Sequence, residues 1–269
     1  MRSAITISLT PQARGGPFVF HDGLANGIAT AAELGFDAVE IFPPAANAID
    51  VAELQSLLDH HRLKVAAIGT GAGWVIHKWS LTHPDPEVRH RARDFIRAII
   101  DVAAAFDAPA ILGSMQGKVE GEVTREQALG WLAEALEDLG EHAAAHGQPF
   151  LYEFLNRYET NILNRVAPTV DFLRGLKTLG VKVLADLFHM NIEEADLAGA
   201  IRAGRDWIGH VHFADSNRQA IGLGHTRIEP IIAALREIGY EGYLSAEIFP
   251  LPDAATAARQ TIESFRHSR

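Results

Sequence analysis

Four side chains able to bind a divalent cation recur at nearly regular intervals in the second half of the chain. In chain order they are Glu153, Asp186, His212 and Glu247. The intervals are 33, 26 and 35 residues, and each residue stands at the end of a short apolar run. Three carboxylates and an imidazole brought to one point would repel one another unless a cation lay between them. An O3N donor set suits Mn²⁺, Mg²⁺ or Co²⁺ better than a soft metal, so the pattern predicts one such ion, with Mn²⁺ the first choice.

These residues converge only if the runs that carry them are neighbouring strands. Short apolar runs alternate with longer amphipathic ones, a pattern typical of repeated βα units. The expected strands are 4–9, 38–42, 65–69, 110–113, 149–154, 181–186, 208–213 and 243–248. Eight units of about 34 residues favour a closed (β/α)8 barrel over a doubly wound sheet. Any one strand-end carboxylate is most often a solvated side chain, but four in register at the carboxyl ends of a barrel indicate a metal site.

The expected helices fill the intervals between the strands and follow the last one. They are 23–34, 51–62, 87–106, 125–146, 168–179, 194–203, 229–238 and 254–265. Left-handed residues after helices are predicted at Gly35, Gly147, Gly180 and Gly239. The stretches 69–73 and 84–86 indicate a long loop after the third strand, and no segment reads as a linker. We therefore expect an α/β fold, a single (β/α)8 TIM barrel domain over 1–269.

Composition narrows the class of protein. Of the 269 residues 48% are hydrophobic and 22% charged, values typical of a folded domain and not of a disordered chain. A formal net charge of −10 argues against nucleic acid and anionic membranes as partners. The chain has no cysteine, which excludes disulfides, thiolate nucleophiles and Cys-based zinc sites. Pro11 and Arg14 interrupt any signal-peptide core, and Asp101 and Asp107 interrupt the most apolar stretch, so a cytoplasmic protein is expected.

Polar residues in the segments after strands five to seven are candidates for contacts with substrate. His189 could form a hydrogen bond with a substrate oxygen, or could simply begin a helix. Arg218 could neutralise a developing oxyanion, or could form a surface ion pair. Glu159 could bind a hydroxyl, or could be a carboxylate favoured at a helix start. Glu40 ends the second strand, and the sequence leaves open whether it points into the barrel mouth.

Two glycine-rich runs and one aromatic run are weaker candidates for binding motifs. The run 222–225 lacks the spacing and the acidic residue of a dinucleotide-binding turn, and 69–73 lacks the Lys-Ser/Thr of a phosphate-binding loop. Trp74, His77 and Trp79 could form an apolar wall over a bound substrate, or could fold over the rim against one another.

Several segments resemble the sugar isomerase/epimerase superfamily with a xylose isomerase-like barrel, in particular the ketose 3-epimerases (the tagatose, psicose and ribulose 3-epimerase group). They are YEFLNRYET (152–160), DLFHMNIEE (186–194), GHVHFADSNR (209–218) and SAE (245–247), with a further similarity at 81–89. The resemblance implies that the four residues named first are the metal ligands. It also implies contacts of Glu159, His189 and Arg218 with the O1–O3 end of the sugar, and assembly as a homodimer or homotetramer. One departure is Arg227, where the family usually has Asp, within 225–229.

The activity expected from these features is C3 epimerisation of a ketose through a metal-bound enediolate, with Glu153 and Glu247 as the acid/base pair. Aldose–ketose isomerisation of the hydroxypyruvate isomerase type uses the same constellation, and sequence separates the two poorly. A non-catalytic sugar-binding barrel is an alternative of a different class. The superfamily's zinc endonuclease for abasic DNA would need a basic groove, which the net charge of −10 disfavours. The identity of the sugar, and whether it is phosphorylated, stay open.

Overall fold

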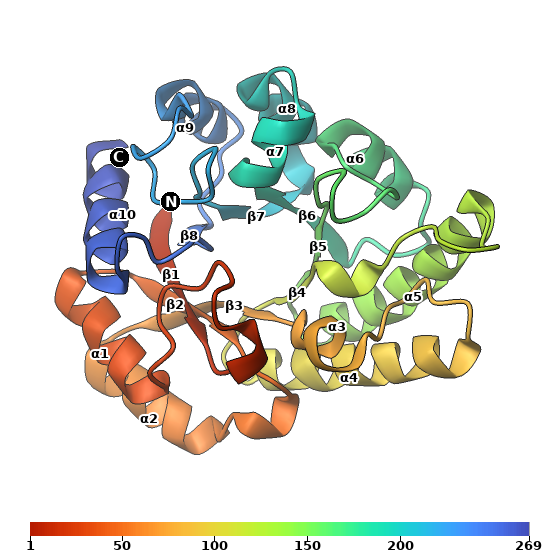
Figure 1. Cartoon of the computed structure of the whole chain (residues 1–269), viewed down its shortest axis with the longest axis horizontal. Helices are drawn as coiled ribbons and strands as arrows, with labels where there is room; N and C mark the ends of the chain where they lie inside the picture. Colours follow the sequence, from red (N-terminus) through yellow and green to blue (C-terminus); the bar gives the residue numbers. More distant parts are fainter. Residues whose placement is uncertain (269) are drawn as a thin grey trace.

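Eight parallel strands close into a barrel in the computed structural model, which describes residues 1–268 (Figure 1). Each strand pairs with the next, and the last pairs with the first. The strands are β1 (Arg2–Ser8), β2 (Ala38–Phe42), β3 (Lys64–Gly69), β4 (Ala110–Leu112), β5 (Phe150–Glu153), β6 (Val181–Asp186), β7 (Ile208–His212) and β8 (Tyr243–Ala246). The closed (β/α)8 barrel expected from the sequence is confirmed.

Helices surround the barrel and cover the outer faces of its strands (Figure 1). They are α1 (Leu24–Leu34), α2 (Val51–His61), α3 (Ala72–His77), α4 (Pro86–Ala104), α5 (Arg125–Ala145), α6 (Val166–Arg174), α7 (Leu187–Glu193), α8 (Leu197–Gly204), α9 (Ile228–Glu237) and α10 (Ala254–Ser268). Side chains fix several of their starts; Thr124 and Gln127, for example, form a reciprocal capping box at α5. Within residues 1–268, no helix is both long enough and apolar enough to cross a bilayer.

The barrel interior has its own small apolar cluster, separate from the larger core. Ala67, Ile111, Leu151 and Leu184 are buried together and come from four consecutive strands. Leu151 and Leu184 stand two residues before Glu153 and Asp186, and residues two apart on a strand share a face. Because the leucines fill the interior, the two carboxylates at the strand ends point inward as well.

Several expected element boundaries were wrong. The segment after β3 contains α3 where the sequence predicted only loop, and α7 forms directly after β6, before the expected start at 194. The helix expected over 168–179 ends at Arg174, where Gly175, a poor helix former, follows. Strand β8 ends at Ala246, so Glu247 lies one residue beyond it.

The expectation for Gly180 was also wrong. Gly35, Gly147 and Gly239 do have positive φ, of 85°, 77° and 70°. Gly180 does not, and it serves a different purpose: a Cβ built on it would lie 2.1 Å from the carbonyl oxygen of Gly140. The residue is therefore required by the close approach of two backbones, which seats the start of β6 on α5.

We expect Gly180→Ala to destabilise the fold by about 1–3 kcal/mol, because the added methyl group meets backbone that cannot move aside. Gly130→Ala is the matched control: Gly130 lies inside α5 with nothing within 4 Å of a built Cβ, so this change should stabilise by up to about 1 kcal/mol. Urea unfolding of both variants measures the difference. Equal midpoints for the two alanine variants would contradict the close-packing explanation.

Candidate metal centre

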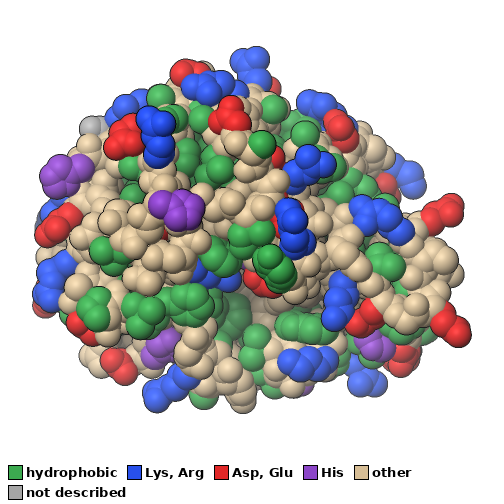
Figure 2. Space-filling model, turned by 45° about the horizontal axis from the view of Figure 1, so that its top comes forward, with side chains coloured by type: hydrophobic (Ala, Val, Ile, Leu, Met, Phe, Trp, Pro, Cys, Tyr) green, Lys and Arg blue, Asp and Glu red, His purple; other side chains and the backbone are tan. Residues whose placement is uncertain are grey.

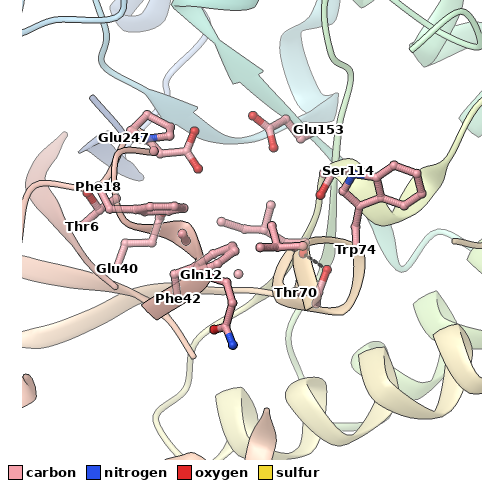
Figure 3. A pocket seen from close by; sticks show the side chains of 18 of the residues that line it. Thr6, Gln12, Phe18, Glu40, Phe42, Thr70, Trp74, Ser114, Glu153 and Glu247 are labelled. Carbon is pink, nitrogen blue, oxygen red and sulfur yellow. Dashed lines mark hydrogen bonds between the residues drawn. The ribbon is translucent and has the colours of Figure 1, made fainter. Parts of the chain in front are cut away.

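A cavity of about 480 Å³ opens at the carboxyl ends of the barrel strands. On the face drawn in Figure 2, hydrophobic side chains gather round a hollow near the middle of the molecule. Glu153 and Glu247 lie on either side of the upper part of the cavity, while Phe18, Phe42 and Trp74 lie lower around it (Figure 3). The cavity therefore has an acidic end and an aromatic end.

The four side chains that the sequence singled out meet at the acidic end. One ligand atom from each lies within 4.8 Å of those of the other three. His212 Nδ1 is 3.3 Å from Asp186 Oδ2, 3.4 Å from Glu153 Oε1 and 3.8 Å from Glu247 Oε2. The expected convergence is confirmed as geometry, including for Glu247 at its position just past β8.

Local structure orients two of the three carboxylates. Asp186 caps α7: its Oδ1 accepts hydrogen bonds from the backbone N–H groups of Phe188 (2.7 Å) and His189 (3.4 Å), which leaves Oδ2 to face the cluster. Glu153 passes close over Gly113, where a Cβ would lie 2.6 Å from Glu153 Oε2. One carboxylate is thus oriented by a helix start and the other by the absence of a side chain.

Glu40 lines the cavity and contacts the imidazole of His212, whereas the sequence had left open whether it points into the barrel mouth. Its buried carboxylate lies 2.8 Å from His210 Nε2 and 3.2 Å from His212 Nε2. A proton on His212 Nε2 directed at Glu40 leaves Nδ1 with its lone pair toward the cluster. The signal in the sequence was the His-Val-His run of β7, whose alternation places His210 one layer below His212.

Burial and mutual repulsion shift the protonation of the cluster. Burial raises the pKa of Glu153 to about 8 and also raises the pKa of Glu247, despite opposing contributions from His212 and Arg218. Burial disfavours ionised Asp186 as well, but His189 and His212 outweigh it and lower its pKa. For His212, burial is outweighed by the carboxylates around it, led by Glu40, and its pKa rises. Protons thus balance the negative charge when no cation is bound.

Two further observations indicate that the cluster suits a divalent cation. Glu153 Oε1 is buried and has no hydrogen-bond partner among residues 1–268, and buried polar atoms rarely lack one. The donors are three carboxylates and one imidazole nitrogen, which is the hard donor set that Mn²⁺, Mg²⁺ and Co²⁺ accept. A cation would supply the charge that protons otherwise supply.

His189 presents a single polarised N–H to the same space. Its Nδ1 lies 2.7 Å from Asn156 Nδ2 and accepts from the Asn156 backbone N–H at 3.2 Å. Two donors on Nδ1 place the ring proton on Nε2, which lies 3.7 Å from Glu153 and 3.8 Å from Asp186. That atom is buried without a hydrogen-bond partner in the described chain, so it is free to donate to a bound molecule.

Arg218 connects the cluster to Glu159. Its guanidinium contacts Glu247, lies 3.8 Å from both Asp186 and Glu159, and stacks 4.9 Å from the ring centre of Phe188. Burial alone would lower the pKa of Arg218, but the neighbouring carboxylates outweigh burial and raise it, so the guanidinium stays positively charged. The structure therefore brings Glu159, His189 and Arg218 to one side of the cluster, as the sequence led us to expect.

Asp215 fixes the conformation of the loop after β7 by hydrogen bonds, a role that the sequence analysis missed. Its carboxylate accepts from the backbone N–H groups of Ser216, Gly222, Gly224 and Thr226 at 2.7–2.9 Å. This explains the 222–225 run: a Cβ on Gly224 would lie 2.3 Å from Asp215 Oδ1. Arg227, the departure noted in the sequence, is the N-cap position of α9 and makes no side-chain cap.

The aromatic run after β3 divides between both expected roles. Trp74 on α3 lines the cavity, whereas His77 stacks on Trp79 with ring centres 4.2 Å apart. Phe18 and Phe42 form the opposite wall, with their ring centres 4.4 Å apart. This wall was not foreseen, because it depends on how the loop after β1 brings Phe18 to Phe42 at the end of β2.

Comparison with known proteins agrees with this architecture. The family model described as a xylose isomerase-like TIM barrel matches residues 28–267. The chain is 32% identical over 231 residues to an L-ribulose 3-epimerase from Methylomonas sp., covering 84% of this chain and 79% of that protein. It is also 32% identical over 231 residues to a D-psicose 3-epimerase from Ruminiclostridium cellulolyticum, covering 82% and 77%.

A solved structure of a D-allulose 3-epimerase from Methylomonas sp. superposes with a TM-score of 0.83 at 26% identity, covering 100% of this chain and 99% of the other. These relatives are epimerases, which are isomerase-class enzymes. The chain belongs to the xylose isomerase-like TIM barrel family, and its relatives there are ketose 3-epimerases.

Proposed function

We propose that this protein is a divalent-metal-dependent ketose 3-epimerase in which Glu153 and Glu247 move the proton at C3. The observation that carries the proposal is the placement of two carboxylates, that of buried Glu153 and that of largely buried Glu247, on either side of one end of the cavity (Figure 3). Inversion at carbon requires that a proton leave one face and return to the other. Two carboxylates facing across the substrate supply both faces.

The chain's own residues account for each proton movement. One glutamate accepts the C3 proton, which is acidic because it lies next to the C2 carbonyl, and the other donates a proton to the opposite face of the enediolate. In the reverse reaction the two glutamates exchange roles. The His189 Nε2–H and the Arg218 guanidinium stabilise negative charge on the substrate oxygens, and Glu159 accepts a hydroxyl hydrogen.

We propose that Glu153, Asp186, His212 and Glu247 hold the cation, Mn²⁺ first and Mg²⁺ or Co²⁺ as alternatives. When bound, a divalent cation acts as a Lewis acid that polarises a carbonyl and offsets the charge of the carboxylates. Glu40 keeps the His212 Nδ1 lone pair directed at that position.

The size of the cavity bears on the alternatives. About 480 Å³ with an aromatic end formed by Phe18, Phe42 and Trp74 favours a sugar with carbons beyond C3 over a three-carbon substrate such as hydroxypyruvate. A purely sugar-binding barrel would leave the facing glutamates without a purpose. Location in the cytoplasm, homodimeric or homotetrameric assembly and the absence of nucleic-acid or membrane partners stay predictions.

The activity is tested by incubating the Mn²⁺-loaded protein in D2O with D-fructose, D-psicose, D-tagatose and L-ribulose, followed by proton NMR after metal removal. We expect deuterium at C3 together with a new C3 epimer. Glu153→Gln and Glu247→Gln should each lower turnover by about 10²-fold or more, because each removes one proton carrier. Glu33→Gln, on the exposed face of α1, is the control. Full epimerase activity in metal-loaded Glu247→Gln would rule out the two-base scheme.

Metal removal gives a second prediction. Dialysis against EDTA should abolish turnover, and Mn²⁺ should restore it. Mn²⁺ at about 100 times its Kd should also stabilise the fold by about 2.7 kcal/mol, because it binds only the folded chain. Thermal unfolding with and without Mn²⁺ measures this. Activity that survives complete metal removal, checked by elemental analysis, would contradict the proposal.

Glu40→Gln tests the orientation of His212. The amide can accept from one imidazole only and presents an N–H to the other, so we expect the Kd for Mn²⁺ to rise about 10- to 100-fold. Calorimetric titration with Mn²⁺ measures the change, again with Glu33→Gln as the control. An unchanged Kd in Glu40→Gln would show that the His212 ring needs no partner on Nε2.

A further inference from the structure

Helices α4 and α5 pack side by side on the outside of the barrel and share a ladder of polar pairs (Figure 1). Each rung joins a residue of α4 to one 41 positions later on α5, and successive rungs are four residues apart. The rungs are Arg93–Glu134 at 2.8 Å, Arg97–Asp138 at 2.6 Å and Asp101–His142 at 2.6 Å. The first two rungs pair an arginine with a carboxylate, and the third is of a different kind.

In the third rung the acidic and basic partners exchange helices, and a second imidazole joins the pair. Here α4 supplies the carboxylate, and α5 supplies the imidazole of His142. His146, one turn later, places its Nε2 3.3 Å from the same Asp101 oxygen, with the two imidazole ring centres 5.0 Å apart. The three potential ligand atoms all lie within 4.8 Å of one another. Two imidazoles at positions i and i+4 with a carboxylate opposite form the half-open donor set of a zinc site.

We propose that Asp101, His142 and His146 form a second metal site, which takes Zn²⁺ in preference to Mn²⁺ or Mg²⁺. The N2O donor set is softer than the O3N set of the cavity, and imidazole nitrogen favours Zn²⁺, while carboxylate oxygen alone favours Mg²⁺ and Mn²⁺. With neutral imidazoles the rung carries one negative charge, whereas each arginine–carboxylate rung is neutral. A cation at this rung is therefore electrostatically favoured, and water can complete its coordination because the residues are half-buried to exposed.

The order of strands and helices places this site at the opposite end of the barrel from the cavity. Asp101 stands near the end of α4, a few residues before β4 begins, and His146 follows α5 just before β5 begins. The ends of these helices lie at the amino-terminal face of a barrel, whereas the cavity opens at the carboxyl ends of the strands. A metal here joins α4 to α5 and stabilises the barrel without touching substrate, so the proposal is independent of the proposed epimerase activity.

Competition calorimetry on the whole protein tests the proposal. Metal-free protein is first saturated with Mn²⁺ and then titrated with Zn²⁺, and bound metal is counted after gel filtration. We expect two metal ions per chain at the end of the titration: one in the cavity cluster, which is Mn²⁺ or the Zn²⁺ that displaces it, and one Zn²⁺ at the rung. His146→Gln and Asp101→Asn should weaken that Zn²⁺ binding at least tenfold, while the Mn²⁺ stoichiometry and turnover stay unchanged.

The matched control is His90→Gln, since His90 lies 3.4 Å from Asp94 on α4 as a single imidazole–carboxylate pair. It should leave both metal counts intact. Circular dichroism confirms the fold of every variant. The second site would be overturned if the only Zn²⁺ bound were that which displaces Mn²⁺. It would also be overturned if His90→Gln and His146→Gln weakened Zn²⁺ binding equally. If the unsubstituted protein binds Zn²⁺ at the rung but shows no epimerase turnover, that result would count against the proposed epimerase activity and not against the second metal site.

Discussion

The burial of several carboxylates at one point is the constraint on which the rest of this site depends. Isolated buried carboxylates cost several kcal/mol each, so the surrounding structure must supply positive charge or donors. Here the start of α7 donates two backbone N–H groups to Asp186, and Arg218 contacts Glu247. Glu40 adds a further carboxylate but lies between His210 and His212, which balance it. Under the proposed function, a cation would complete this balance.

The barrel makes such a concentration of charge possible because its strands hold their ends rigidly. The period of two along each strand puts leucine one layer below each of two carboxylates, so the apolar interior carries a polar end. The loops are fixed by polar anchors: Asp215 gathers four backbone N–H groups, and Gln116 donates to the carbonyls of Gly113 and Glu153. These hydrogen bonds orient the loops that surround the donor atoms.

Sequence alone predicts the parts of this site that lie on regular strands. The spacing of Glu153, Asp186 and His212 could be converted into neighbouring positions because parallel strands of a barrel end at one face. Gly180 shows where this reasoning fails: a glycine before a strand indicates a helix end, and only the approach of α5 reveals that the residue makes room for backbone. Phe18 likewise depends on the path of a loop, which no local pattern encodes.

Under the proposed function, the division of the cavity into an acidic and an aromatic end separates the residues that move protons from those that recognise the sugar. The acidic end is carried by β5 to β8 and by the residues directly after them, whose positions the barrel register determines. The aromatic end comes from Phe42, the last residue of β2, and from the segments after β1 and β3, which carry Phe18 and Trp74. Because none of these aromatic side chains lies on β5 to β8, changes at Phe18, Phe42 or Trp74 are expected to alter which molecule fits without displacing Glu153 and Glu247. Under the proposed function, KM should respond to the aromatic end, and kcat to the acidic end.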